Sequence, residues 1–214
     1  YGNSITLIEG VHDSSQSGMI NQSAAIHAAL LASTGNHIHL LDGDDAYCPE
    51  RIESYERLWL TLPDAVMVHG PLDIIDSNGV NLKSAGHILI PPERHLAWIY
   101  QHNRPDGLFP TSALAFRRDF LHRHLPLDFS DQLHYAVDAR LSILALCTGS
   151  ILLLADPQTR YRKRAASMSS AILCLTQAAN TRLHCEGFNL TAAIAGKPPI
   201  NYWFNNRYYR QLLR

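Results

Sequence analysis

The sequence lacks several patterns that would assign it to a common functional class. Its four cysteines form no C-x-x-C pair, so we expect neither a zinc site nor a disulfide framework. The default reading is a reducing compartment. No apolar run reaches about 18 residues, so no membrane-spanning helix is expected. The formal net charge of −1 excludes the global basic field of most nucleic-acid binders, and we expect no nucleic-acid partner.

The composition is that of a globular protein with a real core. The chain has 214 residues, of which 46% are hydrophobic and 17% charged, enough for one domain with a small appendage. The twelve histidines are scattered and show no metal-ligand spacing. There is no internal repeat and no low-complexity linker. Because the chain begins with Tyr1 and enters a strand pattern almost at once, we expect it to start inside a larger sequence.

The most informative stretch is residues 38–53, which reads IHLLDGDDAYCPERIE. Its first four residues indicate a short buried strand, and Asp42, Asp44 and Asp45 follow where that strand should end. Pro49 suits the first turn of a helix. The pattern is therefore strand, acidic turn, helix. In open α/β sheets, ligands bind at the carboxyl ends of the strands.

The acidic turn admits two interpretations. Asp and Gly are ordinary turn residues, and an Asp is an ordinary helix cap. Only one of the three aspartates is needed to begin a helix, however. Carboxylates held this close repel one another and raise each other's pKa. A hard divalent cation with oxygen ligands relieves that repulsion, so the turn is a candidate metal site.

Strand and helix patterns alternate through the first third of the chain, which predicts an α/β fold with a parallel sheet. Hairpin-like strands in the middle make the sheet mixed. The predicted strands are 4–9, 38–41, 65–70, 72–75, 80–90, 109–116 and 150–154. The predicted helices are 19–33, 49–62, 93–102, 120–124 and 132–147, followed by two helical stretches after residue 171 that are separated near Gly187.

Four blocks of the sequence, in this order, resemble glycosyltransferase family 2, whose enzymes have the GT-A fold. The block from Gly35 to Glu53 is specific, because LDGDD followed by PERIE is close to the family's metal motif. The other three blocks are weak alone and persuasive in sequence, and they span residues 18–30, 109–119 and 138–169.

The resemblance implies a GT-A-like, Rossmann-like fold with a mixed, mostly parallel sheet flanked by helices. It implies an inverting transfer of sugar from a nucleotide-diphosphate sugar to a glycan acceptor, with Mn²⁺ or Mg²⁺ on the diphosphate. Asp44 and Asp45 would contact the metal, and Asp42 and Asp44 the donor. Asp138 would be the catalytic base. Arg162 would meet phosphate, since guanidinium suits oxyanions. The alternatives for Asp138 and Arg162 are solvated surface residues.

This chain departs from the family pattern in three places. The family's first nucleotide-binding strands would precede Tyr1. Val137 stands where the family has a glutamate beside the base, which removes one carboxylate. Arg164 stands where relatives often have a histidine that helps to hold metal, and arginine cannot take that role. These departures leave open a non-catalytic GT-A-like binding or scaffold domain, and, less well supported, a nucleotidyltransferase.

We divide the chain into a GT-A-like domain, residues 1–170, and a C-terminal helical extension, residues 171–214, packed on that domain. The tail from Asn201 mixes aromatic residues with Arg207, Arg210 and Arg214. Packing on its own domain is the favoured reading of this tail, and contact with a membrane surface or a partner helix is the alternative. We expect a cytoplasmic location, with membrane association through the tail as an option.

Overall fold

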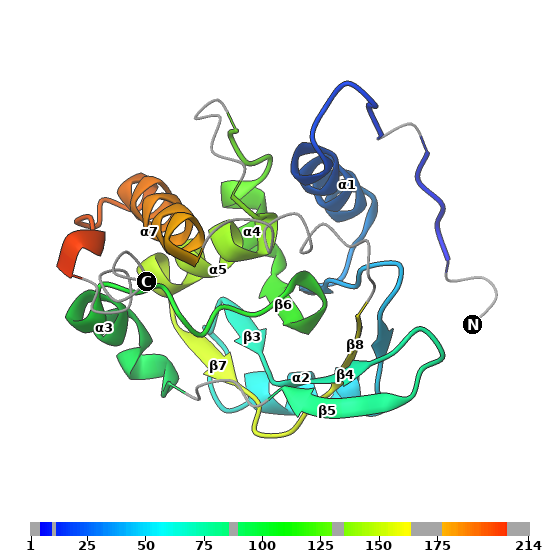
Figure 1. Cartoon of the computed structure of the whole chain (residues 1–214). Coiled ribbons are helices and arrows are strands. Elements are labelled where there is room, and N and C mark those ends of the chain that lie inside the picture. The colour runs from blue at the N-terminus through cyan, green and yellow to red at the C-terminus, as the bar shows by residue number, and fades with distance from the viewer. Residues whose placement is uncertain (1–4, 10–11, 86–89, 130–134, 164–176, 205–214) are drawn as a thin grey trace.

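The computed structural model describes residues 5–9, 12–85, 90–129, 135–163 and 177–204 (Figure 1). In chain order, the elements are α1 (Gly18–Ala32), β1 (His37–His39), β2 (Ala46–Tyr47), α2 (Arg51–Trp59), β3 (Met67–His69), β4 (Leu72–Ile75), β5 (Asn81–Ala85), α3 (Pro92–His102), η1 (Thr111–Ala113), β6 (Leu114–Arg117), α4 (Arg118–His124), α5 (Val137–Thr148), β7 (Ile151–Leu153), β8 (Thr159–Arg162), α7 (Gln177–Ile194) and η2 (Tyr202–Phe204). The predicted α/β class is confirmed.

Local sequence signals explain where several of these elements begin and end. Ser17 caps α1, because its hydroxyl accepts a hydrogen bond from the backbone N–H of Ile20. Asn103 ends α3 in the left-handed conformation, with a φ of 49°. Between β4 and β5, the side chain of Asp76 accepts hydrogen bonds from two backbone N–H groups, and Gly79 supplies the positive φ of the turn.

The described strands form two four-stranded sheets, with strand orders β1-β6-β3-β7 and β2-β8-β4-β5. The sheets are mixed, as predicted, but four of the six pairings are antiparallel and only β3–β7 and β4–β8 are parallel. The expectation of a mostly parallel sheet was wrong. The physical reason is that β6 lies between β1 and β3 and runs opposite to both, so the two early strands are not neighbours.

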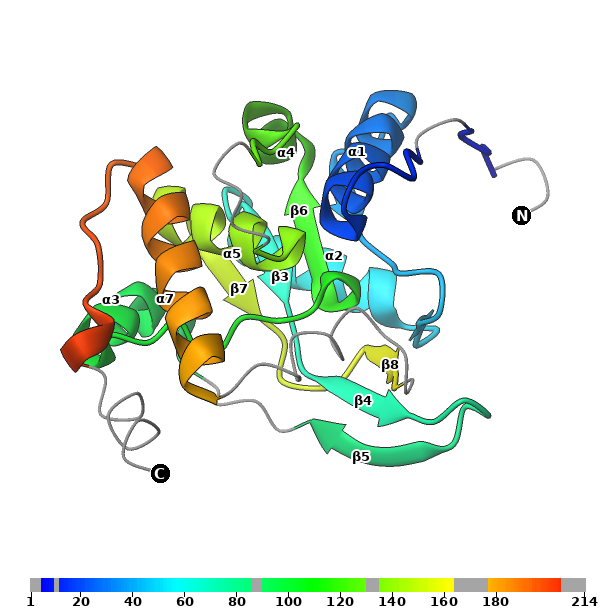
Figure 2. The same ribbon diagram turned by 45° about the horizontal axis from the view of Figure 1, so that its top comes forward.

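The two faces of the β1-β6-β3-β7 sheet are covered by different helices, and a hydrophobic cluster lies on each face. Val68 and Ala115 pack with Tyr55 and Trp59 of α2 on one face. On the other face, Met67 of β3 belongs, with Phe116 of β6, to the larger hydrophobic cluster, which includes the buried hydrophobic residues of α5. Helix α7 packs against α5 on the far side of that cluster (Figures 1 and 2). This alternation of faces is what strand geometry dictates.

Other predictions differ from the structure in detail. Residues 5–9 have no regular secondary structure and pair with no strand among the described residues, and Ile5 is 84% exposed. Their apolar alternation marks strand propensity, but a strand also needs a partner edge. The break predicted near Gly187 was wrong, because α7 is continuous through it. The strand predicted at 109–116 begins only at Leu114, after a 3₁₀ turn.

Two predictions about the C-terminal part are not tested by the structure. The domain boundary after residue 170 and the tail from residue 205 lie outside the described residues. Among the helices that the structure describes, none is both long and apolar enough to cross a bilayer.

Candidate active site

The acidic turn leaves the carboxyl end of β1, as the sequence predicted. Leu40 continues the strand direction and donates its backbone N–H to the carbonyl of Leu114, 3.1 Å away. The turn then closes with a hydrogen bond of 3.1 Å from the N–H of Asp45 to the carbonyl of Asp42. Helix α2 begins at Arg51 rather than at the predicted Pro49, because residues 48–51 form a turn in which the N–H of Arg51 donates to the carbonyl of Cys48 over 3.1 Å.

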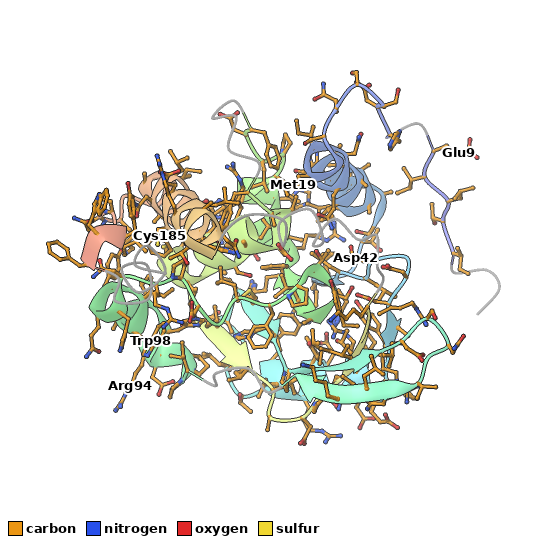
Figure 3. All side chains as sticks on the ribbon, viewed as in Figure 1. Glu9, Met19, Asp42, Arg94, Trp98 and Cys185 are labelled. Atoms are coloured by element: carbon orange, nitrogen blue, oxygen red, sulfur yellow. The ribbon has the colours of Figure 1, made fainter. Side chains whose placement is uncertain are left out.

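Asp42 is held between α1 and the segment before β6. Its Oδ1 accepts a hydrogen bond of 3.1 Å from Nε2 of Gln22, and its N–H donates to Oγ of Ser112 over 3.0 Å. Burial raises the pKa of the Asp42 carboxyl, and the charges of Asp45 and Asp44 raise it further. In Figure 3, Asp42 lies below the end of α1.

Asp138 reaches the same place from the first turn of α5. Its Oδ2 accepts a hydrogen bond of 3.1 Å from the N–H of Thr111, and its Oδ1 accepts one of 2.7 Å from the N–H of Ala139. The hydroxyl of Thr111 in turn accepts a hydrogen bond from Gln22, which also holds Asp42. Burial, together with the negative charge of Asp42, raises the pKa of Asp138 to about 6.

Asp45 faces β8, where Arg162 donates its backbone N–H to Oδ1 over 2.7 Å. Burial raises the pKa of Asp45, while this hydrogen bond opposes the shift. The other oxygen, Oδ2, is buried and has no hydrogen-bond partner within the described part of the chain. A buried carboxylate oxygen without a donor is costly unless something else satisfies it.

The guanidinium of Arg162 clamps two turns together. Its Nε donates to the carbonyl of Asp44 over 2.7 Å, and its Nη1 donates to the carbonyls of Asp76 and Ser77 over 2.8 and 2.9 Å. These contacts tie the acidic turn to the β4–β5 turn. The predicted contact of Arg162 with phosphate stays a prediction, and the observed role of this side chain is structural.

The acidic turn contains carboxylates, the side chains that bind a divalent cation when it is shared with a ligand. No group of three His, Cys, Asp or Glu side chains is arranged to hold a metal ion in the described ranges. Mg²⁺, however, is commonly bound by one or two carboxylates, with phosphate oxygens and water completing its shell. Asp44 and Asp45 are two carboxylates in one turn, and the Oδ2 of Asp45 is a buried oxygen without a hydrogen-bond partner in the described part of the chain.

The structure brings four predicted side chains together and adds residues that sequence reasoning missed. Asp42 and Asp138 share the Gln22–Thr111 link, and Asp42 also feels the charges of Asp44 and Asp45. Gln22 lay within a recognised block but was not singled out. Its amide among the apolar residues of α1 was the available signal.

A cavity of about 500 Å³ lies at the Arg117 end of β6, opposite the Leu114 end that contacts the acidic turn. None of the predicted site residues lines it. The lining residues are Asn36, His37, Arg117, Arg118, Asp119 and His122. Both arginines already donate to carbonyl or carboxylate oxygens of the protein.

No known protein-family profile matches the chain. Over 108 residues it is 32% identical to a curated protein of Nostoc sp. (strain PCC 7120) named as an uncharacterized glycosyltransferase. The match covers 50% of this chain and 33% of the relative, so the chain matches about a third of that relative's length.

The chain also resembles solved structures of TarS 1–349 from S. aureus. One match has a TM-score of 0.46 and 18% identity, and it covers 75% of this chain and 48% of TarS. The complex of TarS with UDP-GlcNAc gives 0.45, 15%, 86% and 58% for the same quantities. At TM-scores below 0.5, these similarities support no statement about function. The predicted resemblance to glycosyltransferases is confirmed by the Nostoc relative.

Proposed function

We propose that this chain carries the metal and base residues of an inverting, metal-dependent glycosyltransferase of family 2. The substrate would be a nucleotide-diphosphate sugar, and the acceptor a hydroxyl of a saccharide or another glycan. The observation that carries the proposal is the meeting of Asp42 and Asp138 at Thr111, although 95 residues of chain separate them. The sequence similarity to a glycosyltransferase supports the same reading.

Asp138 has the properties of a general base. A base works best when its pKa lies slightly below the working pH, so that it is ionised yet still takes up a proton. With a pKa of about 6, Asp138 is mostly ionised at pH 7. It would accept the proton of the acceptor hydroxyl while that oxygen bonds to the anomeric carbon. The bond from this carbon to the diphosphate breaks on the opposite face, which inverts the configuration.

Asp44 and Asp45 would hold Mn²⁺ or Mg²⁺ against the diphosphate. When bound, the cation neutralises the charge that develops on the leaving diphosphate. Asp42 would support the turn from behind, since its side chain is already bonded to Gln22. Charge neutralisation would also relieve the mutual repulsion of the carboxylates.

Val137 bears on whether the base remains competent. This residue replaces the family's glutamate, and it is fully buried in the core. Orientation of Asp138 therefore does not depend on a carboxylate at position 137. The backbone N–H groups of Thr111 and Ala139 hold both oxygens of Asp138 instead. This arrangement favours a working base over the alternative of a non-catalytic binding or scaffold domain.

The proposal is tested by measuring release of nucleoside diphosphate from a panel of nucleotide sugars with Mn²⁺, with and without glycan acceptors. We expect turnover that depends on metal and that Asp138→Asn lowers by about 100-fold or more, a usual contribution of a general base. Asp64→Asn is the matched control, because the side chain of Asp64 is 99% exposed and its carboxylate lies 3.7 Å from Arg117, at the end of β6 that is opposite Leu114. Equal turnover by Asp138→Asn and the wild type would remove the proposed base.

A further inference from the structure

Arg51, the first residue of α2, is a buried cation without a carboxylate partner in the described part of the chain. Its side chain is fully buried. The guanidinium carbon lies 4.1 Å from the ring centroids of both Tyr47 and Tyr55, so two aromatic faces enclose it. Its Nε has no hydrogen-bond partner among the described residues. Burying this charge costs desolvation free energy, which an uncharged methionine at the same position would avoid.

The two ends of the guanidinium contact the two segments that support the acidic turn. Nη1 donates to the hydroxyl of Thr159 at the start of β8, and Nη2 donates to the carbonyl of Leu114 at the start of β6 over 3.3 Å. That same carbonyl accepts the N–H of Leu40, which immediately precedes the turn. A single rigid group therefore joins β8, β6 and the end of β1.

A chain of contacts continues from Arg51 to Asp42. The hydroxyl of Thr159, which accepts from Arg51, donates to the carbonyl of Ser112 over 3.2 Å. The hydroxyl of Ser112 then accepts the N–H of Asp42 over 3.0 Å. On the other side of the turn, the hydroxyl of Tyr47 donates to the carbonyl of Leu40 while its ring packs on Arg51.

We propose that Arg51 is a positioning residue of the acidic turn. Acting through Thr159 and Ser112 it fixes Asp42, and acting through Tyr47 and Leu114 it fixes the two ends of the turn. This inference rests on the proposed function, because the turn is useful in this geometry only if it binds a ligand. Lysine would keep the charge but not the planar fork that reaches two acceptors at once.

The test measures binding of UDP to the full 214-residue chain in Mn²⁺ by calorimetry. A temperature of about 10 °C keeps destabilised variants folded, since it lies well below their Tm. We expect Arg51→Met to weaken binding about tenfold or more and Arg51→Lys to lie between it and the wild type. Thr159→Val should weaken binding several-fold. The double variant should be no weaker than Arg51→Met alone, since both changes break one chain of contacts.

Trp59→Phe is the matched control, since Trp59 is 2% exposed and lies at the other end of α2. Its indole donates to the carbonyl of Ala65, away from the turn. This variant should destabilise α2 yet bind UDP within about twofold of the wild type, because the rings that Trp59 contacts, those of His37 and His39, precede the turn, and phenylalanine keeps an aromatic ring against them. A purely structural Arg51 would behave like Trp59.

Amide hydrogen exchange separates failure of the inference from failure of the proposed function. Arg51→Met should speed exchange at Asp42 and Asp45 about tenfold or more in the ligand-free protein, and Trp59→Phe should not. Wild-type protein that binds none of UDP, GDP, TDP and ADP in Mn²⁺, with this exchange pattern intact, would refute the function and keep the positioning role. Unchanged exchange at both residues, or unchanged UDP binding by Arg51→Met beside a binding wild type, would overturn the inference.

Discussion

Replacing Asp138 with asparagine should remove a pH-dependent penalty on the folded state. The pKa of Asp138 is raised from 3.8 to about 6 by burial and by the charge of Asp42. The unfolded chain therefore releases this proton near pH 4, whereas the folded protein retains it until about pH 6. Below both values the carboxyl is neutral in both states and costs nothing. Stability is lost as the pH rises between them, and the full penalty applies above about pH 6.

The magnitude follows from the shift of about two pKa units, at about 1.4 kcal/mol each. The penalty is about 3 kcal/mol at pH 7.5 and about 1 kcal/mol at pH 4.5. Asparagine also loses one of the two acceptors that Thr111 and Ala139 use, which costs about 1–3 kcal/mol at every pH. The net effect at one pH is therefore small, but the stability of Asp138→Asn relative to wild type should rise by about 2 kcal/mol over this range.

Urea unfolding at about pH 4.5, 6 and 7.5 measures this difference for the wild type, for Asp138→Asn and for the exposed control Asp64→Asn. The free energy of unfolding of Asp138→Asn, taken relative to wild type, should rise by about 2 kcal/mol from pH 4.5 to pH 7.5, while that of the control relative to wild type stays constant. A constant difference between wild type and Asp138→Asn would refute the reasoning, because it would mean that Asp138 titrates alike in both states.

Three further substitutions test separate contacts. Gly187→Ala places a Cβ 2.4 Å from ring carbons of Tyr135. Thermal melting should therefore show a loss of about 1–3 kcal/mol of stability, although alanine normally stabilises a helix relative to glycine. An unchanged or higher Tm would contradict this packing. Gln22→Leu removes the amide that holds Asp42, so calorimetry in Mn²⁺ should show that the variant binds UDP about tenfold more weakly than the wild type. Equal UDP affinity of variant and wild type would contradict this. Arg162→Lys loses the guanidinium that donates to the carbonyls of both Asp44 and Asp76, so urea unfolding should show a loss of about 1–3 kcal/mol of stability. A variant as stable as the wild type would contradict this role of Arg162.

Local signals were enough to predict much of the fold. The helix predicted at residues 19–33 from apolar spacing is observed as α1, and the turn predicted at residues 76–79 is observed between β4 and β5. Such features depend on contacts between near neighbours, which a single sequence displays directly. Strand order depends instead on which distant segments meet. The insertion of β6 between β1 and β3 has no signature in any of the three strands, so the direction of the sheet was missed.

The site divides in the same way. Three aspartates in four residues are visible as a motif, and resemblance to a family singled out Asp138. Residues that hold these carboxylates are individually unremarkable in the sequence. Gln22 is one polar residue of a helix, and Arg51 reads as a solvated charge in an acidic and basic run. Only the tertiary structure shows that Arg51 is buried and that Gln22 bridges Asp42 to the loop before β6.

The central claim is that the acidic turn binds a nucleoside diphosphate through a divalent cation. Calorimetry with UDP, GDP, TDP and ADP, each with and without Mn²⁺, tests it most directly. The account predicts that one of these nucleotides binds only with metal, that Asp44→Ala and Asp45→Ala abolish the binding, and that Asp64→Ala leaves it unchanged. Binding that is independent of Mn²⁺, or that survives both substitutions in the turn, would contradict the account.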